Sequence, residues 1–472
     1  MKVFRRILPL VLALLLLALP ALATSAPEAH AISFVDDEGF AIALDQPATS
    51  IISLYSAHTE NLYALGAGAR LIGACATSTY PPEAAFLPRY EYTQDPEVLI
   101  AANPDLILIR PFVTKKAPDF VAALRKAGIP VVSLLPESLA LFDDYIQKLA
   151  LLTGTSAASG QKLADFHAQL DAISQKTERI PKKTRTFFES TETELRTVTD
   201  QSMAGQAIGL AGGINVAAGA PAVSKGSTIA AFGAEKILMH AGEIDVYVSQ
   251  RGAMNAGGDA HAIAIRPGFS AIKAIRDGRI LTINEKLISS PTFRYTKGVK
   301  ELARFFYPDV MDDLTPWRTG AQATRRDFAH ILTRARHLPV FVPSSSKYYA
   351  KAHKGHVYGL FEDVPWTDAD FDAIETCVQA GYIASDELRY DPSGPVTRDA
   401  LARAIFLIGD FSVQDAHAAI GDLDKCAKAT LVQTLVDQGV FALESGQFNP
   451  TRPVTNAEIL DALSRVHASY PS

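Results

Sequence analysis

The chain has 472 residues, a formal net charge of −6 and 48% hydrophobic residues, so it is long enough to form two or three domains. Its acidic balance argues against nucleic acid as a partner, because contacts with phosphates require clustered lysine and arginine. The three cysteines, Cys75, Cys377 and Cys426, share no metal-binding spacing. We expect buried thiols, and a disulfide between Cys377 and Cys426 is the alternative in an oxidising compartment.

The first 23 residues are predicted to be a signal peptide. Lys2, Arg5 and Arg6 precede an apolar run over residues 7–19, and Ala21-Leu22-Ala23 then fits the small-x-small pattern of a signal peptidase site. A membrane anchor is the alternative, but the run is shorter than the roughly 20 residues that cross a bilayer. Removal of the three basic residues would take the net charge from −6 to −9. No cysteine follows the run, so we expect an exported protein of the periplasm or cell envelope without a lipid anchor.

Short apolar runs alternate with amphipathic segments between residues 51 and 138. Strands are predicted at 51–54, 71–74, 106–109 and 130–134, and helices after residue 56 and at 95–102 and 120–127. This alternation predicts a parallel sheet covered by helices.

A long helical segment over residues 139–180, interrupted near Gly154, follows this first lobe. Its apolar residues recur at spacings of three and four from Leu163 to Ile173, as expected for one buried face. The alternation of strands and helices then restarts over residues 184–308. The predicted fold class is therefore α/β, with two lobes built on central sheets and joined by one long helix, in a domain over residues 32–308.

A second repeat pattern is found between residues 315 and 467. The clearest copy begins at Phe361 and continues through a helix at 369–380 to Thr397, which is expected to cap a second helix. A partial copy begins at Thr324, and a degraded copy begins at Gly421. We expect a mainly α-helical repeat domain after the two lobes.

Five sequence blocks occur in a fixed order within the two predicted lobes: SLYSAHTENLYALG at 53–66, YPPEA at 80–84, PEVLIAANPD at 96–105, PGFSAIKAIRDGR at 267–279 and SPT at 290–292. Together they resemble the cobalamin, haem and ferric-siderophore group of periplasmic binding proteins, known as class III. This resemblance implies capture of an iron or cobalt chelate between two rigid lobes and its delivery to an ABC permease with its ATPase. No catalytic residue and no resident cofactor or metal site are expected.

The loops that follow the strands are expected to line the binding site, because ligands of open α/β sheets gather at the carboxyl ends of the strands. Aromatic residues there offer flat apolar area, and arginines match the anionic oxygens of a chelate. Ten cleft residues are predicted on this basis: Tyr55, Ser56, His58, Tyr80, Arg110, Phe112, Arg251, Phe293, Arg294 and Tyr295.

Some of these residues have a simpler interpretation. Arg110 and Arg294 could be solvated loop charges, and Tyr80 could pack on the prolines that follow it. His58 could ligate iron or cobalt, but a capping or core histidine is the stronger interpretation.

Glu97 and Glu235 stand near the start of helices that precede corresponding strands of the two lobes. An acid at this position stabilises a helix through its dipole. In the family that the chain resembles, one such acid in each lobe pairs with arginines of the permease. The resemblance therefore assigns Glu97 and Glu235 to permease docking.

The repeats over residues 315–467 resemble S-layer homology repeats, which bind cell-wall polymers. The resemblance implies polymer contacts by Asp363, Trp366 and Arg398, although the last copy has Asn456 where arginine is usual. The alternative function is therefore a structural protein of the cell envelope. An enzyme is the third hypothesis, but the sequence has no nucleophile elbow, phosphate loop or paired His/Cys ligand set.

Overall fold

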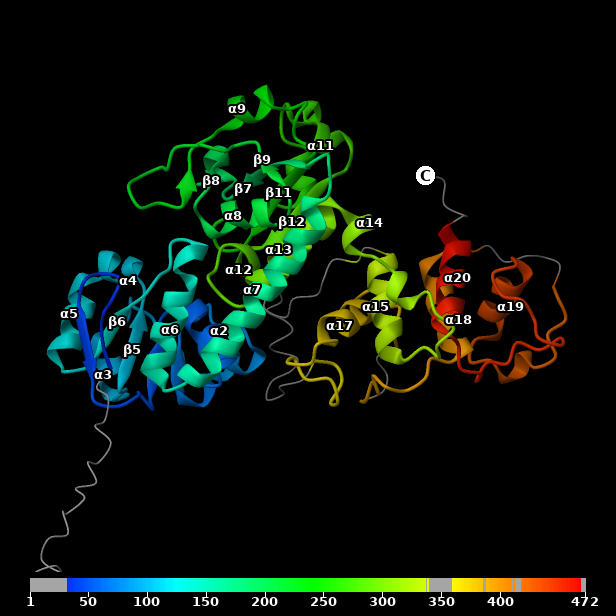
Figure 1. The fold of residues 1–472 in the computed structure, drawn as a ribbon, viewed down its shortest axis with the longest axis horizontal. Helices are drawn as coiled ribbons and strands as arrows, with labels where there is room; N and C mark the ends of the chain where they lie inside the picture. The colour runs from blue at the N-terminus through cyan, green and yellow to red at the C-terminus, as the bar shows by residue number, and fades with distance from the viewer. Residues whose placement is uncertain are drawn as a thin grey trace, which may run out of the picture.

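The computed structural model describes residues 32–336, 338, 359–384, 388–409, 411 and 417–467, so the predicted signal peptide lies outside the described residues. Figure 1 shows two α/β lobes, coloured blue to cyan and green, and a helical module coloured yellow to red beside them. This arrangement confirms the predicted fold class.

The first lobe is built on a four-stranded parallel sheet of strand order β4-β3-β5-β6. The central strand β5 consists of four buried apolar residues, as expected for a strand covered on both faces. A hairpin of β1 and β2, which the sequence analysis did not predict, precedes the sheet. The bounds are β1 (Ile32–Val35), β2 (Ala41–Leu44), β3 (Ile51–Ser53), α2 (Ser56–Ala64), β4 (Leu71–Ala74), α3 (Pro96–Ala101), β5 (Leu106–Ile109), α4 (Pro111–Lys116), α5 (Pro118–Lys126) and β6 (Val131–Ser133).

The connection between the lobes consists of two helices, α6 (Phe142–Thr153) and α7 (Ser156–Glu178). Gly154 ends α6 in the left-handed conformation, with φ 63°, which explains the predicted interruption. The apolar face from Leu163 to Ile173 is buried as predicted. In Figure 1, α7 runs from the first lobe into the second, where it packs against α13.

The second lobe repeats the plan with a parallel sheet of strand order β12-β11-β7-β9. A short antiparallel pair, β8 with β10, lies beside it. The bounds are β7 (Arg185–Glu189), β8 (Thr197–Val198), α8 (Met203–Leu210), β9 (Ile214–Asn215), β10 (Ile229–Ala230), α9 (Ala234–Met239), β11 (Val246–Arg251), α10 (Ala260–Ala264), α11 (Lys273–Arg276), β12 (Ile280–Asn284), α12 (Glu285–Ile288), α13 (Tyr295–Phe306) and α14 (Pro308–Met311).

The helical module has its own apolar core, and its three repeat copies meet through their helix starts. Thr324 bridges to Pro395, Thr397 to Pro453, and Thr455 to Gln322. Thr324, Thr397 and Thr455 also cap the helices that follow them, which for Thr397 confirms the capping prediction. The module helices are α15 (Arg325–Ala335), α17 (Phe371–Gln379), α18 (Arg398–Ile408), α19 (Ala429–Asp437) and α20 (Asn456–His467).

Two aspartates occupy equivalent positions in successive copies. The Asp363 carboxylate accepts hydrogen bonds from the backbone N–H groups of Tyr390 and Asp391, each at 2.8 Å. The Asp422 carboxylate does the same for the backbone N–H groups of residues 448 and 449, at 2.7 and 2.8 Å. Asp391 and Asn449 both adopt the left-handed conformation. The module is therefore a structural repeat, in which Asp363 closes a turn.

The module packs against both lobes. The Trp366 indole N–H donates a hydrogen bond to Glu83 of the first lobe at 2.6 Å, and its ring meets Tyr80 edge to face at 5.5 Å. Lys297, on α13 of the second lobe, forms an ion pair with Asp372 of α17. These contacts place the module across the region where the lobes join.

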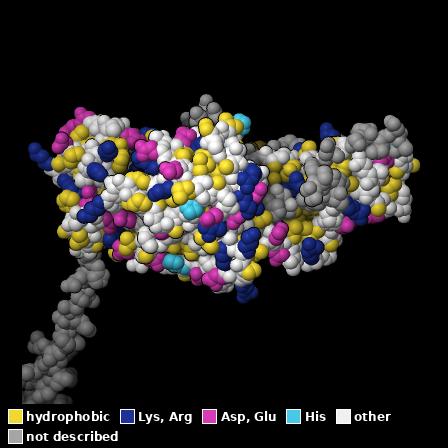
Figure 2. All heavy atoms as spheres, turned by 90° about the horizontal axis from the view of Figure 1, so that it is seen from above, with side chains coloured by type: hydrophobic (Ala, Val, Ile, Leu, Met, Phe, Trp, Pro, Cys, Tyr) yellow, Lys and Arg dark blue, Asp and Glu magenta, His cyan; other side chains and the backbone are white. Residues whose placement is uncertain are grey.

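Acidic and basic side chains are interspersed on the face of the molecule seen in Figure 2. The described part of this face shows no extended basic tract. All three cysteines are buried and free, so the Cys377–Cys426 disulfide does not form in this structure. Among the described residues, no helix has both the length and the apolar character needed to cross a membrane.

Glu375 of α17 is expected to make the stability of the protein depend on pH. It is fully buried: one carboxylate oxygen accepts from the Leu360 N–H at 2.8 Å, and the other has no hydrogen-bond partner among the described residues. Burial raises the pKa of Glu375 from 4.5 to about 7. Because the folded state favours the protonated form, the free energy of unfolding should fall as pH rises above 4.5, by roughly 2 kcal/mol between pH 5 and pH 8.

The substitution Glu375→Gln should abolish this part of the pH dependence and stabilise the protein at pH 8 but little at pH 5. Thermal unfolding at both pH values measures the effect. Glu362→Gln, at an exposed position nearby, is the matched control. Equal pH dependence in wild-type and Glu375→Gln proteins would contradict the prediction.

Candidate ligand-binding cleft

The carboxyl ends of both sheets face a cleft of about 1070 Å³ between the lobes. The first lobe contributes the residues that follow β3, β4 and β5, and the second lobe contributes those that follow β11 and β12. The predicted residues Tyr55, Ser56, Arg110, Phe112 and Arg251 line this cleft. Half of the ten predicted residues thus lie in one cavity. This agrees with the strand-end rule, which is the expectation that residues after the carboxyl ends of the strands line the ligand site.

Arg110 is held between two aromatic rings on the cleft wall. Its guanidinium carbon lies 4.7 Å from the ring centre of Tyr55 and 4.8 Å from that of Phe112. Phe112 is 38% exposed, and Tyr92 meets its ring edge to face at 5.9 Å. Burial raises the pKa of Tyr55 to about 12, so its hydroxyl remains protonated at physiological pH. The wall thus combines a fixed cation with aromatic surface.

Lys286 links the two sides of the cleft. Its ammonium group donates a hydrogen bond to the Ser56 hydroxyl, across the lobes, at 2.9 Å. Arg251 is less constrained. Its guanidinium lies 3.7 Å from the Asp259 carboxylate, and both side chains of this ion pair are exposed. Met254, which is 50% exposed, adds apolar surface from the second lobe. Arg110, Lys286 and Arg251 give the cleft cations on both walls.

Sequence reasoning missed Lys286, Glu285, Tyr92 and Met254. Glu285 and Lys286 follow β12 directly, so the strand-end rule would have found them if it had been applied to that strand. Tyr92 and Met254 lie in longer loops, and no local pattern marks them as cleft residues.

His58 is a core residue and not a metal ligand, which corrects the prediction that it lines the cleft. It is fully buried in α2, and its two ring nitrogens make hydrogen bonds with the Tyr145 hydroxyl at 2.8 Å and the Ile109 carbonyl at 2.9 Å. Burial lowers the pKa of His58 to about 4, so the ring is neutral at physiological pH. Both nitrogens are therefore already used by the protein.

Tyr80, Phe293, Arg294 and Tyr295 also lie away from the cleft. Arg294 is buried against Glu60 of α2, and the Tyr80 ring stacks on its guanidinium at 3.6 Å. Phe293 packs on aromatic rings of the core, and the buried Tyr295 donates to the Met203 carbonyl at 2.7 Å. Residues 293–295 follow helix α12 and not a strand, which is why the strand-end rule does not apply to them.

The exposed acids Glu97 and Glu235 lie in the first turns of α3 and α9, as predicted. Figure 1 places α3 in the first lobe and α9 in the second.

The three residues predicted to bind wall polymer are engaged in internal contacts, which corrects that prediction. Asp363 closes a turn, and Trp366 contacts the first lobe, as described above. Arg398 is 4% exposed, donates to Glu444 at 2.7 Å and stacks over Phe448 at 4.9 Å.

The described residues contain no group of three or more histidine, cysteine, aspartate or glutamate side chains that could hold a metal ion.

Two facing lobes with a preformed cleft between their strand ends define a two-lobed ligand-binding protein. The model of the periplasmic binding protein family matches residues 51–287, and the chain belongs to this family. The match covers about half of the chain and ends before the helical module. Membership agrees with the expectation of a binding protein and not an enzyme.

Similar proteins include an uncharacterized ABC transporter substrate-binding lipoprotein of Bacillus subtilis, 23% identical over 61% of this chain and 88% of that protein. A vitamin B12-binding protein of Vibrio vulnificus is 25% identical over 55% of this chain and 90% of that protein. Among solved structures, the periplasmic heme-binding protein RhuT from Roseiflexus sp. RS-1 is 24% identical with a TM-score of 0.48, covering 56% of this chain and 99% of that one.

Proposed function

We propose that the protein is the exported substrate-binding component of an ABC importer and captures an iron or cobalt chelate. The observation that supports this most strongly is the Arg110 guanidinium, fixed between Tyr55 and Phe112 on the wall of a cleft of about 1070 Å³. A chelate combines a broad apolar body with oxygen atoms, and this wall offers a partner to each.

The cleft carries charges of both signs. Arg110, Lys286 and Arg251 supply cations from both lobes, and Glu91, Glu285 and Glu301 line the same cleft. The cations can pair with the propionates of haem or the anionic oxygens of a ferric siderophore, and the carboxylates can accept hydrogen bonds from the amides of a corrinoid. The mechanism is binding without chemistry, followed by delivery to the permease and its ATPase.

Contacts between the lobes are expected to limit closure to a small hinge motion. The Asn61 amide donates to the Pro291 carbonyl at 2.8 Å, and Arg294 forms a buried pair with Glu60. These bonds cross the hinge side of the cleft and would have to break in a large rotation.

Titration of the purified chain with haem, ferric siderophores of hydroxamate and catecholate type, and cobalamin tests the proposal. Absorption or fluorescence changes should show binding of one class in equimolar amounts. Failure of every chelate to bind would overturn the proposal and favour the structural alternative. In that case the protein should still sediment with purified cell wall.

Glu97 and Glu235 are proposed to dock the protein on its permease. Charge pairs at an interface fix orientation and speed encounter. The double substitution of Glu97→Arg with Glu235→Arg should leave the dissociation constant of the chelate within about twofold. It should reduce uptake into cells by at least about tenfold, because like charges then meet at the interface.

The matched control is Asp119→Asn, in the exposed first turn of α5. Uptake should be normal with this variant. Normal uptake with the double Glu97/Glu235 variant would rule out the docking role.

Residues 315–467 are proposed to be an S-layer-homology-like module that holds the protein near the cell wall. Two observations support this. Three backbone bridges join the residues that start the helices of the repeat copies, and an aspartate closes an equivalent turn in two of the copies. Since Asp363, Trp366 and Arg398 are engaged internally, other residues would contact the polymer. Co-sedimentation of the full chain with purified wall polymer tests this, and an unbound chain would contradict it.

A further inference from the structure

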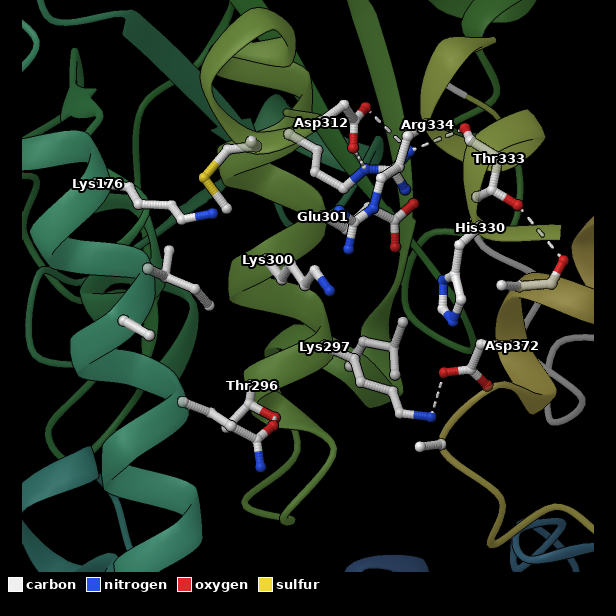
Figure 3. A pocket seen from close by; sticks show the side chains of 18 residues that line it. Lys176, Thr296, Lys297, Lys300, Glu301, Asp312, His330, Thr333, Arg334 and Asp372 are labelled. Atoms are coloured by element: carbon white, nitrogen blue, oxygen red, sulfur yellow. Dashed lines mark hydrogen bonds and ion pairs between the residues drawn. The ribbon is translucent and has the colours of Figure 1, made fainter. Parts of the chain in front are cut away.

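A second cavity, of about 570 Å³, lies between the binding lobes and the helical module (Figure 3). Its walls come from α7 and α13 on one side and from α15 and the start of α17 on the other. This volume lies within the range of about 300–1000 Å³ that is typical of small-molecule sites. The cavity exists only because the module is docked, so any ligand in it would contact both parts of the chain.

The lining of the cavity combines apolar and charged side chains. Apolar surface comes from Ile173, Leu287, Met311 and other lining side chains. Two of the lining acids are already neutralised, because Asp312 is paired with Arg304 and Asp372 with Lys297. The uncompensated charge of the cavity therefore comes from the remaining lining side chains.

Three cations and one acid remain. Among the described residues, no side-chain hydrogen bond or ion pair holds Lys176, Lys300 or Glu301. Arg334 stacks on Trp317 at 4.6 Å and donates one hydrogen bond to the Asp313 carbonyl at 3.3 Å, so its charge has no acidic partner there. Figure 3 shows Lys300 and Glu301 projecting from α13 toward the side where Arg334 projects from α15. The unbalanced charge in the cavity is thus positive.

The pKa shifts of Lys300 and Glu301 agree with a cavity whose positive charge has no full counterion. Lys300 keeps an exposed side chain, and partial desolvation at the cavity wall, followed by the proximity of Arg334 and Arg304, lowers its pKa. Burial raises the pKa of Glu301 to about 7, so this acid compensates only part of the positive charge at physiological pH. An anion placed between Lys300 and Arg334 would relieve the repulsion that these two cations exert on each other.

We propose that this cavity binds a small organic acid, whose acidic group lies between Lys300 and Arg334 and whose apolar body rests on the Ile173, Leu287 and Met311 side chains. Leu287 and Glu301 also border the cleft, so the two sites share a wall. The ligand would fasten the module to the lobes next to the site of chelate capture.

The probe for this test is 8-anilinonaphthalene-1-sulfonate, an aromatic sulfonate whose fluorescence rises in apolar sites. N-phenyl-1-naphthylamine, which has the same aromatic body without the acid, is the matched neutral probe. Fluorescence titration of the full chain should show one equivalent of sulfonate bound at least tenfold more tightly than the neutral probe. Equal affinity for both probes would overturn anion recognition.

The substitutions Lys300→Met and Arg334→Met should each weaken binding of the sulfonate at least tenfold and leave the neutral probe within twofold. Lys162→Met, on the exposed surface of α7, is the control and should change neither. Lys300→Arg should retain binding, and circular dichroism should confirm folding of every variant. Arg110→Met, in the cleft, should retain the site, which separates this proposal from chelate binding. Unchanged sulfonate binding by a folded Lys300→Met protein would overturn the proposal.

Discussion

Arg110→Met should weaken chelate binding by roughly 30- to 100-fold, or about 2–3 kcal/mol. The guanidinium supplies charge-assisted hydrogen bonds, and its removal leaves anionic chelate oxygens without their partner on this wall of the cleft. Tyr55 and Phe112 hold the wild-type guanidinium in place from both sides, so little side-chain entropy is lost when the ligand binds. Titration of wild-type and variant proteins with the chelate that binds wild type measures the loss.

Arg125→Met is the matched control for this substitution. Arg125 also stacks on an aromatic ring, that of Phe40 at 3.6 Å, but it lies on α5 outside the cleft. Its loss should leave the dissociation constant within about twofold. If Arg110→Met bound the chelate as tightly as wild type, the proposed orientation of the ligand against this wall would be wrong.

The alternation of strands and helices made the two lobes predictable, because each buried strand is a short apolar run with a clear boundary. The same regularity placed Tyr55, Ser56, Arg110, Phe112 and Arg251 in the cleft, since each follows or ends a strand. The residues that follow a parallel strand lie at the carboxyl edge of the sheet, whatever the order of the strands. This inference therefore needs no knowledge of long-range packing.

The errors have a common physical cause, which is packing between distant parts of the chain. His58, Glu60 and Asn61 give α2 a polar sequence, and only the surrounding structure shows that each finds a buried partner. Trp366 and its hydrogen-bond partner Glu83 are 283 residues apart in sequence. No local pattern could show that Trp366 docks on the first lobe instead of facing a wall polymer.

Arg294→Met should be among the most destabilising single substitutions in the lobes, at about 3–5 kcal/mol. The Arg294 and Glu60 side chains are only 7% and 9% exposed, and the guanidinium makes two hydrogen bonds to the carboxylate, at 2.6 and 2.5 Å. Removal of one member leaves the other charge buried without its counterion. Chemical denaturation followed by circular dichroism measures the loss of free energy of unfolding.

The double substitution of Glu60→Gln with Arg294→Met should cost less than the two single substitutions together, because it leaves no buried charge behind. Glu243→Gln is the control: Glu243 pairs with Arg185 at the surface, where both are more than 40% exposed, and its loss should cost less than about 1 kcal/mol. Additive effects at Glu60 and Arg294 would mean that the two charges are independently solvated. A strongly coupled pair would instead show that the lobes are fastened to each other at the hinge, which is the condition for a cleft that keeps its shape before the ligand arrives.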